Sequence, residues 1–234
     1  MKIEIIAEIG QNHNGDMALA RDLIHAAKAS GADVAKFQLY DARTLFPKDG
    51  NEWFGYNCKT ELTRDQIAEL SGECERAGIE FMASVFDVER IAWLENIGVR
   101  RYKIASRSVY DAALIQALSR TGKPLLVSLG MWGKDSFPDL SSAGGVGFLY
   151  CVSKYPTPLR DLNLSKVDFE RYAGFSDHTI GIHAAVAALA RGAAVLEKHF
   201  TLDKQMYGPD HAGSMTPDEL IMIDAFRKDL VQCL

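Results

Sequence analysis

Residues 173–199 read AGFSDHTIGIHAAVAALARGAAVLEKH, and this stretch decides the fold of the chain. A strand-like run over residues 173–176 is followed by an alanine-rich, helix-like run over residues 182–191, which Gly192 closes as a helix cap would. A second strand-like run covers residues 194–199. A strand, a helix and a second strand form the unit from which parallel sheets are built. The stretch therefore predicts two neighbouring strands, each ending in a polar triplet that contains a histidine.

The same alternation of short strand-like and longer helix-like runs covers the rest of the chain. The predicted strands are residues 3–9, 34–39, 79–85, 101–105, 125–129, 146–151, 173–176 and 194–199. The predicted helices are residues 17–30, 63–77, 88–97, 111–120, 133–143, 164–171, 182–191 and 217–231. Eight such units predict an α/β fold, a (β/α)8 TIM barrel that forms a single domain over residues 1–234. The fifth helix is expected to be shortened, because residues 133–143 contain Pro138 and four serines or glycines.

Composition limits the alternatives. A doubly wound open sheet is the second candidate fold, but no GxGxxG motif follows the first predicted strand. The net charge of −5 leaves no basic footprint and argues against a nucleic-acid partner. No apolar run approaches the roughly 20 residues that cross a bilayer, so no membrane association is expected. The four cysteines show no metal-ligand spacing, and strand-like sequence follows Met1 without room for a signal peptide, so a cytoplasmic location is expected.

Polar side chains gather where the predicted strands end, which is the face of a barrel that carries the active site. Residues two apart on a strand point the same way, so each strand end presents a defined set. The set comprises Glu8, Lys36, Gln38, Lys103, Ser106, Ser128, Ser153, Ser176, His178, Glu197 and His199. Tyr155 and Asp210 lie in loops at the same end.

Two kinds of site follow from these residue types. A lone lysine in a strand is usually solvated at an edge, but helices cover the strands of a closed barrel, so Lys36 and Lys103 must point inward or to a mouth. A buried lysine requires an anion or a shifted pKa. Together with hydroxyl groups at Ser106, Ser128 and Ser176, the two lysines predict a phosphate or carboxylate site. A single histidine is more often structural than a ligand. The pair His178 and His199 predicts a site for Mn, Fe, Co or Zn.

In its order of motifs the chain resembles the catalytic barrel of the sialic acid synthase family, which includes N-acetylneuraminate, legionaminate and pseudaminate synthases. The resemblance rests on AEIGQNHNG at residues 7–15, KFQ at 36–38, TEL at 60–62, KIAS at 103–106, SLGM at 128–131, YPTP at 155–158, GFSDHT at 174–179, EKHFT at 197–201, and GPD at 208–210 with Ser214.

The resemblance implies a transferase that condenses phosphoenolpyruvate with the open-chain aldehyde of a hexosamine, giving a nine-carbon 2-keto acid and phosphate. His178 and His199 match metal ligands, with Mn²⁺ expected and Mg²⁺, Co²⁺ or Zn²⁺ as alternatives. Residues that match phosphoenolpyruvate contacts are Lys36, Lys103, Ser106, Ser128 and Ser176, and Ser153 occupies the position of a further contact. Residues that match the surroundings of the acceptor sugar are Glu8, Gln38, Tyr155 and Asp210. The metal would polarise the aldehyde as a Lewis acid, and Glu8 or Asp210 would manage protons.

The chain departs from the family pattern near the acceptor. Ser108, preceded by Arg107, replaces an acidic residue that contacts the sugar in the family, and Ser153 stands where an asparagine is expected. Leu129 replaces a threonine. Family members usually continue into a small antifreeze-like domain that reaches across a homodimer, and we expect this protein to lack that domain. A homodimer and a separate antifreeze-like-domain protein are therefore expected partners.

Two other functions stay open at this point. One is a non-catalytic barrel, or one subunit of a split enzyme that needs a partner lid domain. The other is an aldolase or lyase that acts on a 2-keto sugar acid and uses Lys36 or Lys103 as a Schiff-base nucleophile.

Overall fold

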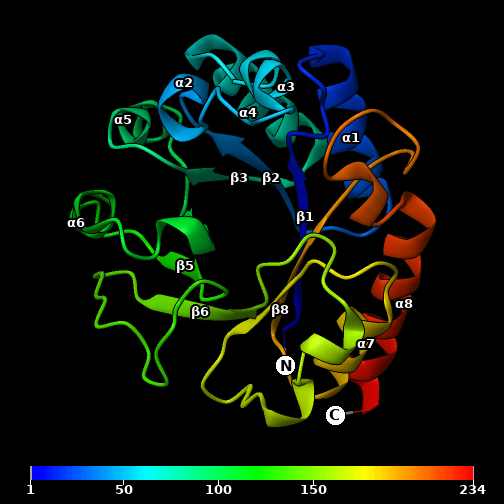
Figure 1. Ribbon diagram of the computed structural model, residues 1–234. Coiled ribbons are helices and arrows are strands. Elements are labelled where there is room, and N and C mark those ends of the chain that lie inside the picture. Colours follow the sequence, from blue (N-terminus) through cyan, green and yellow to red (C-terminus); the bar gives the residue numbers. More distant parts are fainter. Residues whose placement is uncertain (1, 234) are drawn as a thin grey trace.

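A computed structural model describes residues 2–233, and within them eight parallel strands close into a barrel in which β8 pairs with β1 (Figure 1). The strands are β1 (Glu4–Gly10), β2 (Val34–Leu39), β3 (Glu80–Val85), β4 (Tyr102–Ile104), β5 (Leu125–Ser128), β6 (Val146–Cys151), β7 (Gly174–Asp177) and β8 (Val195–His199). The predicted (β/α)8 barrel is confirmed, and closure excludes the open sheet.

Helices surround the barrel on most of its circumference (Figure 1). They are α1 (Met17–Ala29), α2 (Ala42–Leu45), α3 (Phe54–Lys59), α4 (Arg64–Ala77), α5 (Glu89–Asn96), α6 (Ala112–Arg120), α7 (His183–Ala190) and α8 (Pro217–Cys233). The start of α4 follows from its sequence, because Thr63 and Gln66 form the reciprocal capping box. Its end follows from Gly78, which adopts the left-handed conformation at φ 68°. None of the helices within residues 2–233 is both long and apolar enough to cross a membrane.

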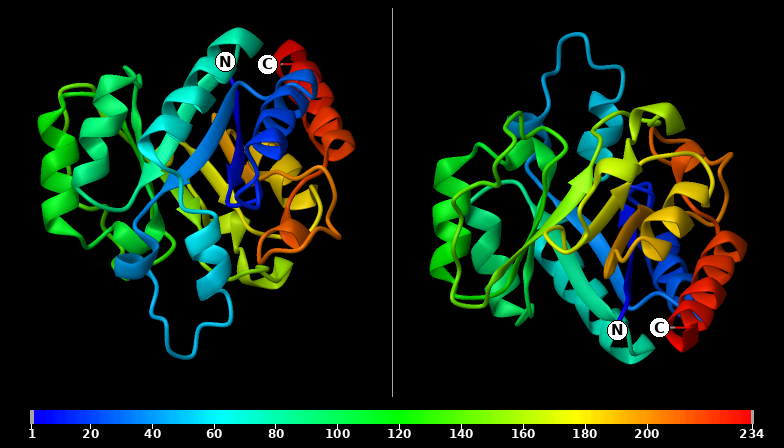
Figure 2. Two further views of the ribbon diagram at one scale, coloured as in Figure 1. Left: turned by 90° about the horizontal axis from the view of Figure 1, so that it is seen from above. Right: turned by 90° about the horizontal axis from the view of Figure 1, so that it is seen from below.

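Two predicted helices are wrong. Residues 133–143 contain no helix, because proline, serine and glycine are poor helix formers. Of residues 164–171, only Leu164–Lys166 form a single 3-10 turn. The sequence predicts no helix between residues 39 and 63, but this segment contains α2 and α3. The loop between these two helices projects from the end of the barrel opposite the N-terminus (Figure 2).

Aromatic side chains cover β6 where helices are missing. The ring of Phe137 lies 4.8 Å from that of Phe148 on β6 and 4.8 Å from that of Tyr172, measured between centroids. The guanidinium of Arg171 lies over Phe137, 4.8 Å from its centroid. The segment from 133 to 143 therefore shields the barrel through one large side chain in place of a helix.

The interior of the barrel is layered, because side chains two residues apart on a strand point to the same side. An apolar layer is formed by Ile6, Val34, Met82, Leu126, Leu149 and Val195. Two residues further along the same strands stand Glu8, Lys36, Ser84, Ser128, Cys151 and Glu197. The apolar layer thus forms the floor on which the polar layer rests.

Ion pairs close the opposite end of the barrel. Arg101 donates to Glu4 on β1 and to Glu80 on β3, with N–O distances of 2.9 Å for Arg101 Nη1 to Glu4 Oε1 and for Arg101 Nε to Glu80 Oε1. Arg227 on α8 donates to the carbonyls of Gly31 at 2.9 Å and Ile3 at 3.3 Å, and pairs with Asp33 and Asp224. The last helix is thereby fixed to the start of the chain.

Candidate active site

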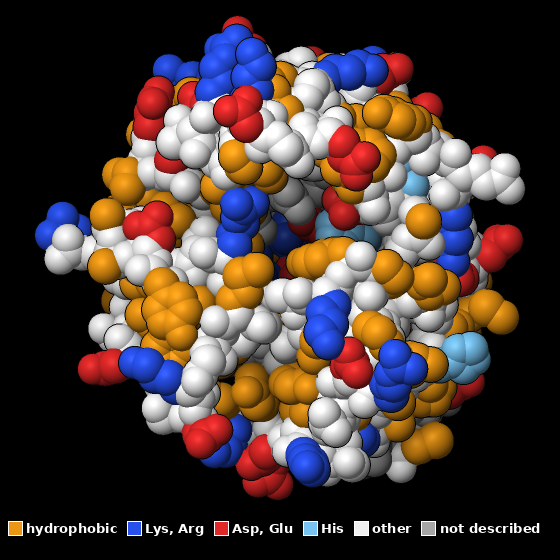
Figure 3. Space-filling view, in the orientation of Figure 1, with side chains coloured by type: hydrophobic (Ala, Val, Ile, Leu, Met, Phe, Trp, Pro, Cys, Tyr) orange, Lys and Arg blue, Asp and Glu red, His pale blue; other side chains and the backbone are white. Residues whose placement is uncertain are grey.

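The barrel opens at the carboxyl ends of its strands into a hollow whose walls show lysine, carboxylate and histidine side chains (Figure 3). Its inner part has an empty volume of about 410 Å³. The predicted site residues that line it are Glu8, Lys36, Gln38, Lys103, Ser106, Ser128, Tyr155, Ser176, His178 and His199. An outer part of about 1310 Å³ is lined by Ser153 and Asp210. The structure therefore brings every predicted site residue to this one end, while their roles stay predictions.

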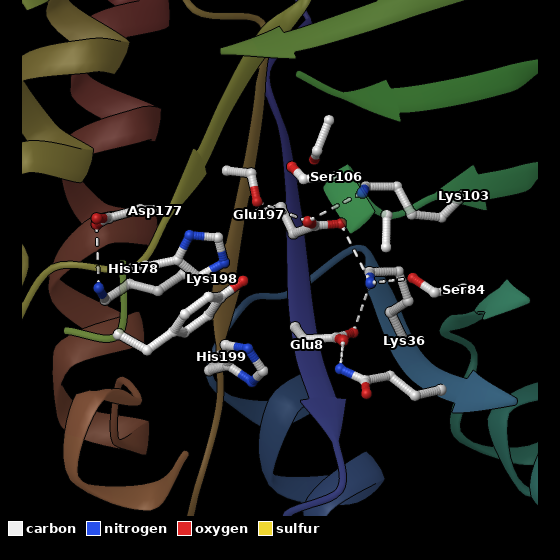
Figure 4. A pocket seen from close by; sticks show the side chains of 15 residues that line it. Glu8, Lys36, Ser84, Lys103, Ser106, Asp177, His178, Glu197, Lys198 and His199 are labelled. Carbon is white, nitrogen blue, oxygen red and sulfur yellow. Dashed lines mark hydrogen bonds and ion pairs between the residues drawn. The ribbon is translucent and has the colours of Figure 1, made fainter. Parts of the chain in front are cut away.

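Glu197 is the centre of the charged layer (Figure 4). Its carboxylate lies 3.3 Å from Lys36 Nζ and 3.6 Å from Lys103 Nζ. Lys36 also lies 2.7 Å from Glu8 Oε2 and donates to Ser84 Oγ at 2.9 Å. Strand register produces this arrangement, because Glu8 pairs with Lys36 across β1 and β2. Lys36 is thus saturated by protein groups.

The two lysines differ in their electrostatics. Burial alone would lower the pKa of Lys36, but the carboxylates of Glu197 and Glu8 outweigh it and raise that pKa above the usual value. Burial lowers the pKa of Lys103, and the more distant carboxylate of Glu197 offsets this only in part. Burial raises the pKa of Glu197, but the two ammonium groups outweigh burial and lower that pKa. Lys103 is consequently the cation with the most to gain from an added anion.

Hydroxyl groups complete the inner cavity. Ser176 donates to Glu197 Oε1 at 2.8 Å, and Ser106 accepts from the Gly130 amide at 3.0 Å. Ser128 Oγ is buried and has no hydrogen-bond partner within residues 2–233. A buried hydroxyl without a partner is costly, so Ser128 is available to a ligand oxygen.

The two histidines stand side by side at the mouth, with ring centroids 6.0 Å apart. His178 Nδ1 lies 3.3 Å from the carbonyl of Val152, a contact that requires the proton on Nδ1 and leaves Nε2 with its lone pair. Burial, with a contribution from His199, lowers the pKa of His178 below its usual range, so the ring is neutral near pH 7. His199 Nδ1 is buried without a partner among the described residues. Imidazole nitrogens without protein partners fit a metal ligand pair.

The histidines would have to share a metal with other ligands. Within residues 2–233, no three His, Cys, Asp or Glu side chains are grouped so that they could hold a metal ion by themselves. Water or substrate oxygens would therefore fill the other coordination positions, which is the pattern of a catalytic site with open positions.

The remaining predicted residues lie around this pair. The ring of Tyr155 lies 4.3 Å from that of His178, between centroids. Gln38 Nε2 donates to Glu8 Oε1 at 2.9 Å, which fixes that carboxylate at the mouth. Asp210 lines a side cavity together with both histidines. Ser153 Oγ lies 3.9 Å from Cys151 Sγ.

Sequence reasoning missed the role of the middle residues in the two triplets. Asp177 and Lys198 border the inner cavity and form a fully buried ion pair of 3.0 Å (Figure 4). Lys198 also donates to the carbonyl of Thr179 at 2.5 Å. Strict alternation along β7 and β8 was the signal that could have found the pair. Also missed were the aromatic residues of the outer cavity, Phe46, Trp53 and Phe86.

A closed barrel with lysines, glutamates and a histidine pair at the carboxyl ends of its strands places this protein among (β/α)8 proteins with a polar site at the barrel mouth. The sequence pattern of the NeuB family matches residues 23–230. The N,N'-diacetyllegionaminic acid synthase of Legionella pneumophila is 37% identical, with 98% of this chain and 70% of the relative aligned. Human N-acetylneuraminate-9-phosphate synthase is 34% identical over 92% of this chain and 67% of its own length. The chain belongs to the NeuB family.

Solved structures agree with this assignment. The N-acetylneuraminic acid synthetase of Leptospira borgpetersenii superposes with a TM-score of 0.89 at 29% identity, covering 100% of this chain and 85% of the other. The resemblance to the sialic acid synthase family is thereby confirmed.

Proposed function

We propose that the protein condenses phosphoenolpyruvate with the open-chain aldehyde of a hexosamine-type sugar to give a nonulosonic 2-keto acid and phosphate. The names of its relatives support synthesis of such acids. The observation that carries the proposal is the division of the hollow into a small inner part that holds Lys36 and Lys103 and a larger outer part, with His199 lining both. This division provides separate places for two substrates.

Phosphoenolpyruvate would meet one cation in the inner cavity, Lys103, that protein carboxylates satisfy only in part. Lys36 already has two carboxylate partners, whereas Lys103 shares only Glu197 at 3.6 Å. Lys103 and the free hydroxyl of Ser128 are therefore the groups that would hold the phosphate or carboxylate. Ser106 and Ser176 would add donors once their hydroxyls reorient.

The histidine pair would hold a divalent metal, for which we propose Mn²⁺. Bound there, the metal would supply Lewis-acid polarisation of the acceptor aldehyde. The chain's own part is to orient the ring of His178, which the Val152 carbonyl does, and to keep that ring neutral, which burial does. Tyr155 packs against that ring and limits access of water to it.

The bond changes balance with water as the third reactant. The enol carbon of phosphoenolpyruvate bonds to the aldehyde carbon, water adds to the neighbouring carbon, and the bond from that carbon to the phosphate oxygen breaks. Water loses both protons as the new keto group forms; one leaves with the phosphate, and the aldehyde oxygen gains the other. Glu8, held by Gln38 and Lys36, and Asp210, beside the histidines, are the carboxylates placed to carry it.

The test measures phosphate release from phosphoenolpyruvate with Mn²⁺ and a panel of hexosamines. His178→Ala is expected to lower both Mn²⁺ affinity, measured by calorimetry, and turnover by at least 100-fold, roughly the loss of one metal ligand. His25→Ala is the matched control, because His25 pairs with Glu73 on the outer surface. Absence of phosphate release with every acceptor, even with an antifreeze-like-domain protein added, would sink the proposal. It would favour a non-catalytic barrel.

One observation favours a second candidate. The lowered pKa of Lys103 suits a Schiff-base nucleophile, as in an aldolase or lyase that acts on a 2-keto sugar acid. Borohydride reduction in the presence of pyruvate would attach pyruvate covalently to Lys103 in that case. Mass spectrometry that finds no pyruvate adduct on Lys103 excludes the aldolase or lyase.

For either chemistry we propose a cytoplasmic location, since all four cysteines of the chain are free thiols.

A further inference from the structure

The outer cavity has one wall that the proposed reaction does not use. Among the described residues that line it, Arg107 is the only lysine or arginine and Asp210 the only aspartate or glutamate. The other lining side chains are mainly aromatic rings, amides and small groups, including Phe46, Trp53 and Asn57. A sugar that fills this cavity would meet a single formal positive charge away from the inner site.

The guanidinium of Arg107 is held in place without a counter-charge. It lies over the ring of Phe46, 5.2 Å from the centroid, and its Nη2 donates to the carbonyl of Leu45 at 3.3 Å. Within residues 2–233 no carboxylate pairs with it. By contrast, Arg90 and Arg101 are each paired with two carboxylates. The guanidinium of Arg107 is thus held in one orientation and has N–H donors that bind no protein group. A planar guanidinium stacked on an aromatic ring is suited to binding phosphate or carboxylate.

This cation is separate from the site proposed for phosphoenolpyruvate. Arg107 does not line the inner cavity, where Lys103 and Lys36 stand. Its neighbour Ser108, where the family resemblance predicts an acidic residue, is buried in a 3-10 turn and lines neither cavity. Apart from Asp210, no carboxylate among the described residues lines the outer cavity, so the charge of Arg107 is available to an anionic sugar.

We propose that the acceptor sugar carries an anionic group, a phosphate monoester or a carboxylate, which Arg107 binds. The inference rests on the proposed function and names its acceptor class. His199 and Arg107 both line the outer cavity, so a sugar with its aldehyde at the histidines extends into the space that Arg107 borders. Arg107 is a specificity-determining residue in this view, because it contacts the distal group of the sugar and none of the reacting atoms.

The test compares N-acetylmannosamine, its 6-phosphate and the corresponding uronic acid, using the purified wild-type protein, Arg107→Gln and Arg43→Gln. Arg43 is an exposed arginine of α2 that lines neither cavity, so its variant removes the same charge from the same end of the barrel. Wild type is expected to bind one of the two anionic sugars at least 10-fold more tightly than the neutral sugar in calorimetry. Arg107→Gln is expected to abolish that preference, since charge-assisted hydrogen bonds contribute about 10- to 100-fold in affinity. Arg43→Gln should retain it.

Kinetics separate a binding role from a structural one. Arg107→Gln should raise KM for the anionic acceptor and leave KM for phosphoenolpyruvate unchanged. Equal losses for neutral and anionic sugars, or no preference in wild type, would overturn the inference. The calorimetric arm contains no phosphoenolpyruvate, so it decides the inference even if no acceptor yields phosphate and the proposed function fails. The two anionic sugars distinguish a phosphate from a carboxylate.

Discussion

The hydroxyl of Ser128 lowers the stability of the ligand-free protein and is available to bind a ligand. Its hydroxyl is buried and unpaired in the absence of ligand, which costs roughly 1 kcal/mol or more. Ser128→Ala is therefore expected to raise the free energy of unfolding by about 1 kcal/mol. The same change should weaken phosphoenolpyruvate binding about 5- to 10-fold, because one hydrogen bond to a charged oxygen is lost. Urea denaturation and calorimetry measure the two effects.

Ser84 is the matched control for this prediction. Its hydroxyl accepts from Lys36 at 2.9 Å, so Ser84→Ala should lower stability by about 1 kcal/mol. A Ser128→Ala protein that is less stable than wild type would contradict the account of a free hydroxyl.

The sequence predicted correctly where the site residues lie in the barrel. It did not predict which side chains pair with one another there. Alternation along single strands placed His178, His199 and both lysines at one mouth. The partner of each lysine depends on register between strands, and no strand contains that information by itself. Glu197 could therefore be placed at the mouth from sequence but not between Lys36 and Lys103.

Among the elements, α8 depends on one arginine for its position. Arg227 joins this helix to Asp33 and to the carbonyls of Gly31 and Ile3. Arg227→Ala removes the cation that pairs with Asp33 and with the mostly buried Asp224, and the donor to two carbonyls, so the free energy of unfolding is expected to fall by about 2 kcal/mol in urea denaturation. Phosphoenolpyruvate affinity should not change, because this contact lies at the end of the barrel away from the mouth.

Lys228 provides the comparison on the same helix. Its side chain is 68% exposed and pairs with Asp224, so Lys228→Ala should cost less than about 1 kcal/mol. Equal losses for the two variants would show that Arg227 acts as an ordinary surface charge.

Elements with strong local signals were predicted well, and elements held by tertiary contacts were not. The capping box at Thr63 and the glycine at 78 mark the ends of α4 in the sequence itself. In contrast, residues 133–143 are shaped by the packing of Phe137 on β6, a contact between segments that no local pattern records. Likewise, α2 and α3 were not predicted, because the sequence between β2 and α4 is polar and contains glycine.

The stability of the whole barrel should depend on pH through His13. This residue follows β1, is fully buried, and accepts a hydrogen bond from the Gly15 amide on Nδ1 at 3.2 Å, while its Nε2 has no partner among the described residues. Burial lowers its pKa from 6.5 to about 4. The unfolded chain therefore takes up a proton that the folded chain resists, and stability present above pH 6.5 is lost as pH falls toward 4.

Between pH 7.5 and about pH 4, His13 is expected to lower the free energy of unfolding by about 3 kcal/mol. His13→Asn is the control, since the asparagine oxygen can accept from Gly15 but does not titrate. Urea denaturation at pH 7.5 and about pH 4 should show a smaller acid loss for the variant by this amount. Parallel losses in the two proteins would contradict the assignment.

The barrel closes through pairing of β8 with β1, at Glu8 and His199, so it can close only late in the synthesis of the chain. A ribosome delivers the amino-terminal strands long before the segment that contains Glu197. Until that segment emerges, the nascent sheet has two open edges, and Lys36 and Lys103 lack the carboxylate that they share. Joining strands so distant in the chain is slow compared with forming local helices. Catalytic competence should therefore be the last property that a newly made molecule acquires, after most of its helices have formed.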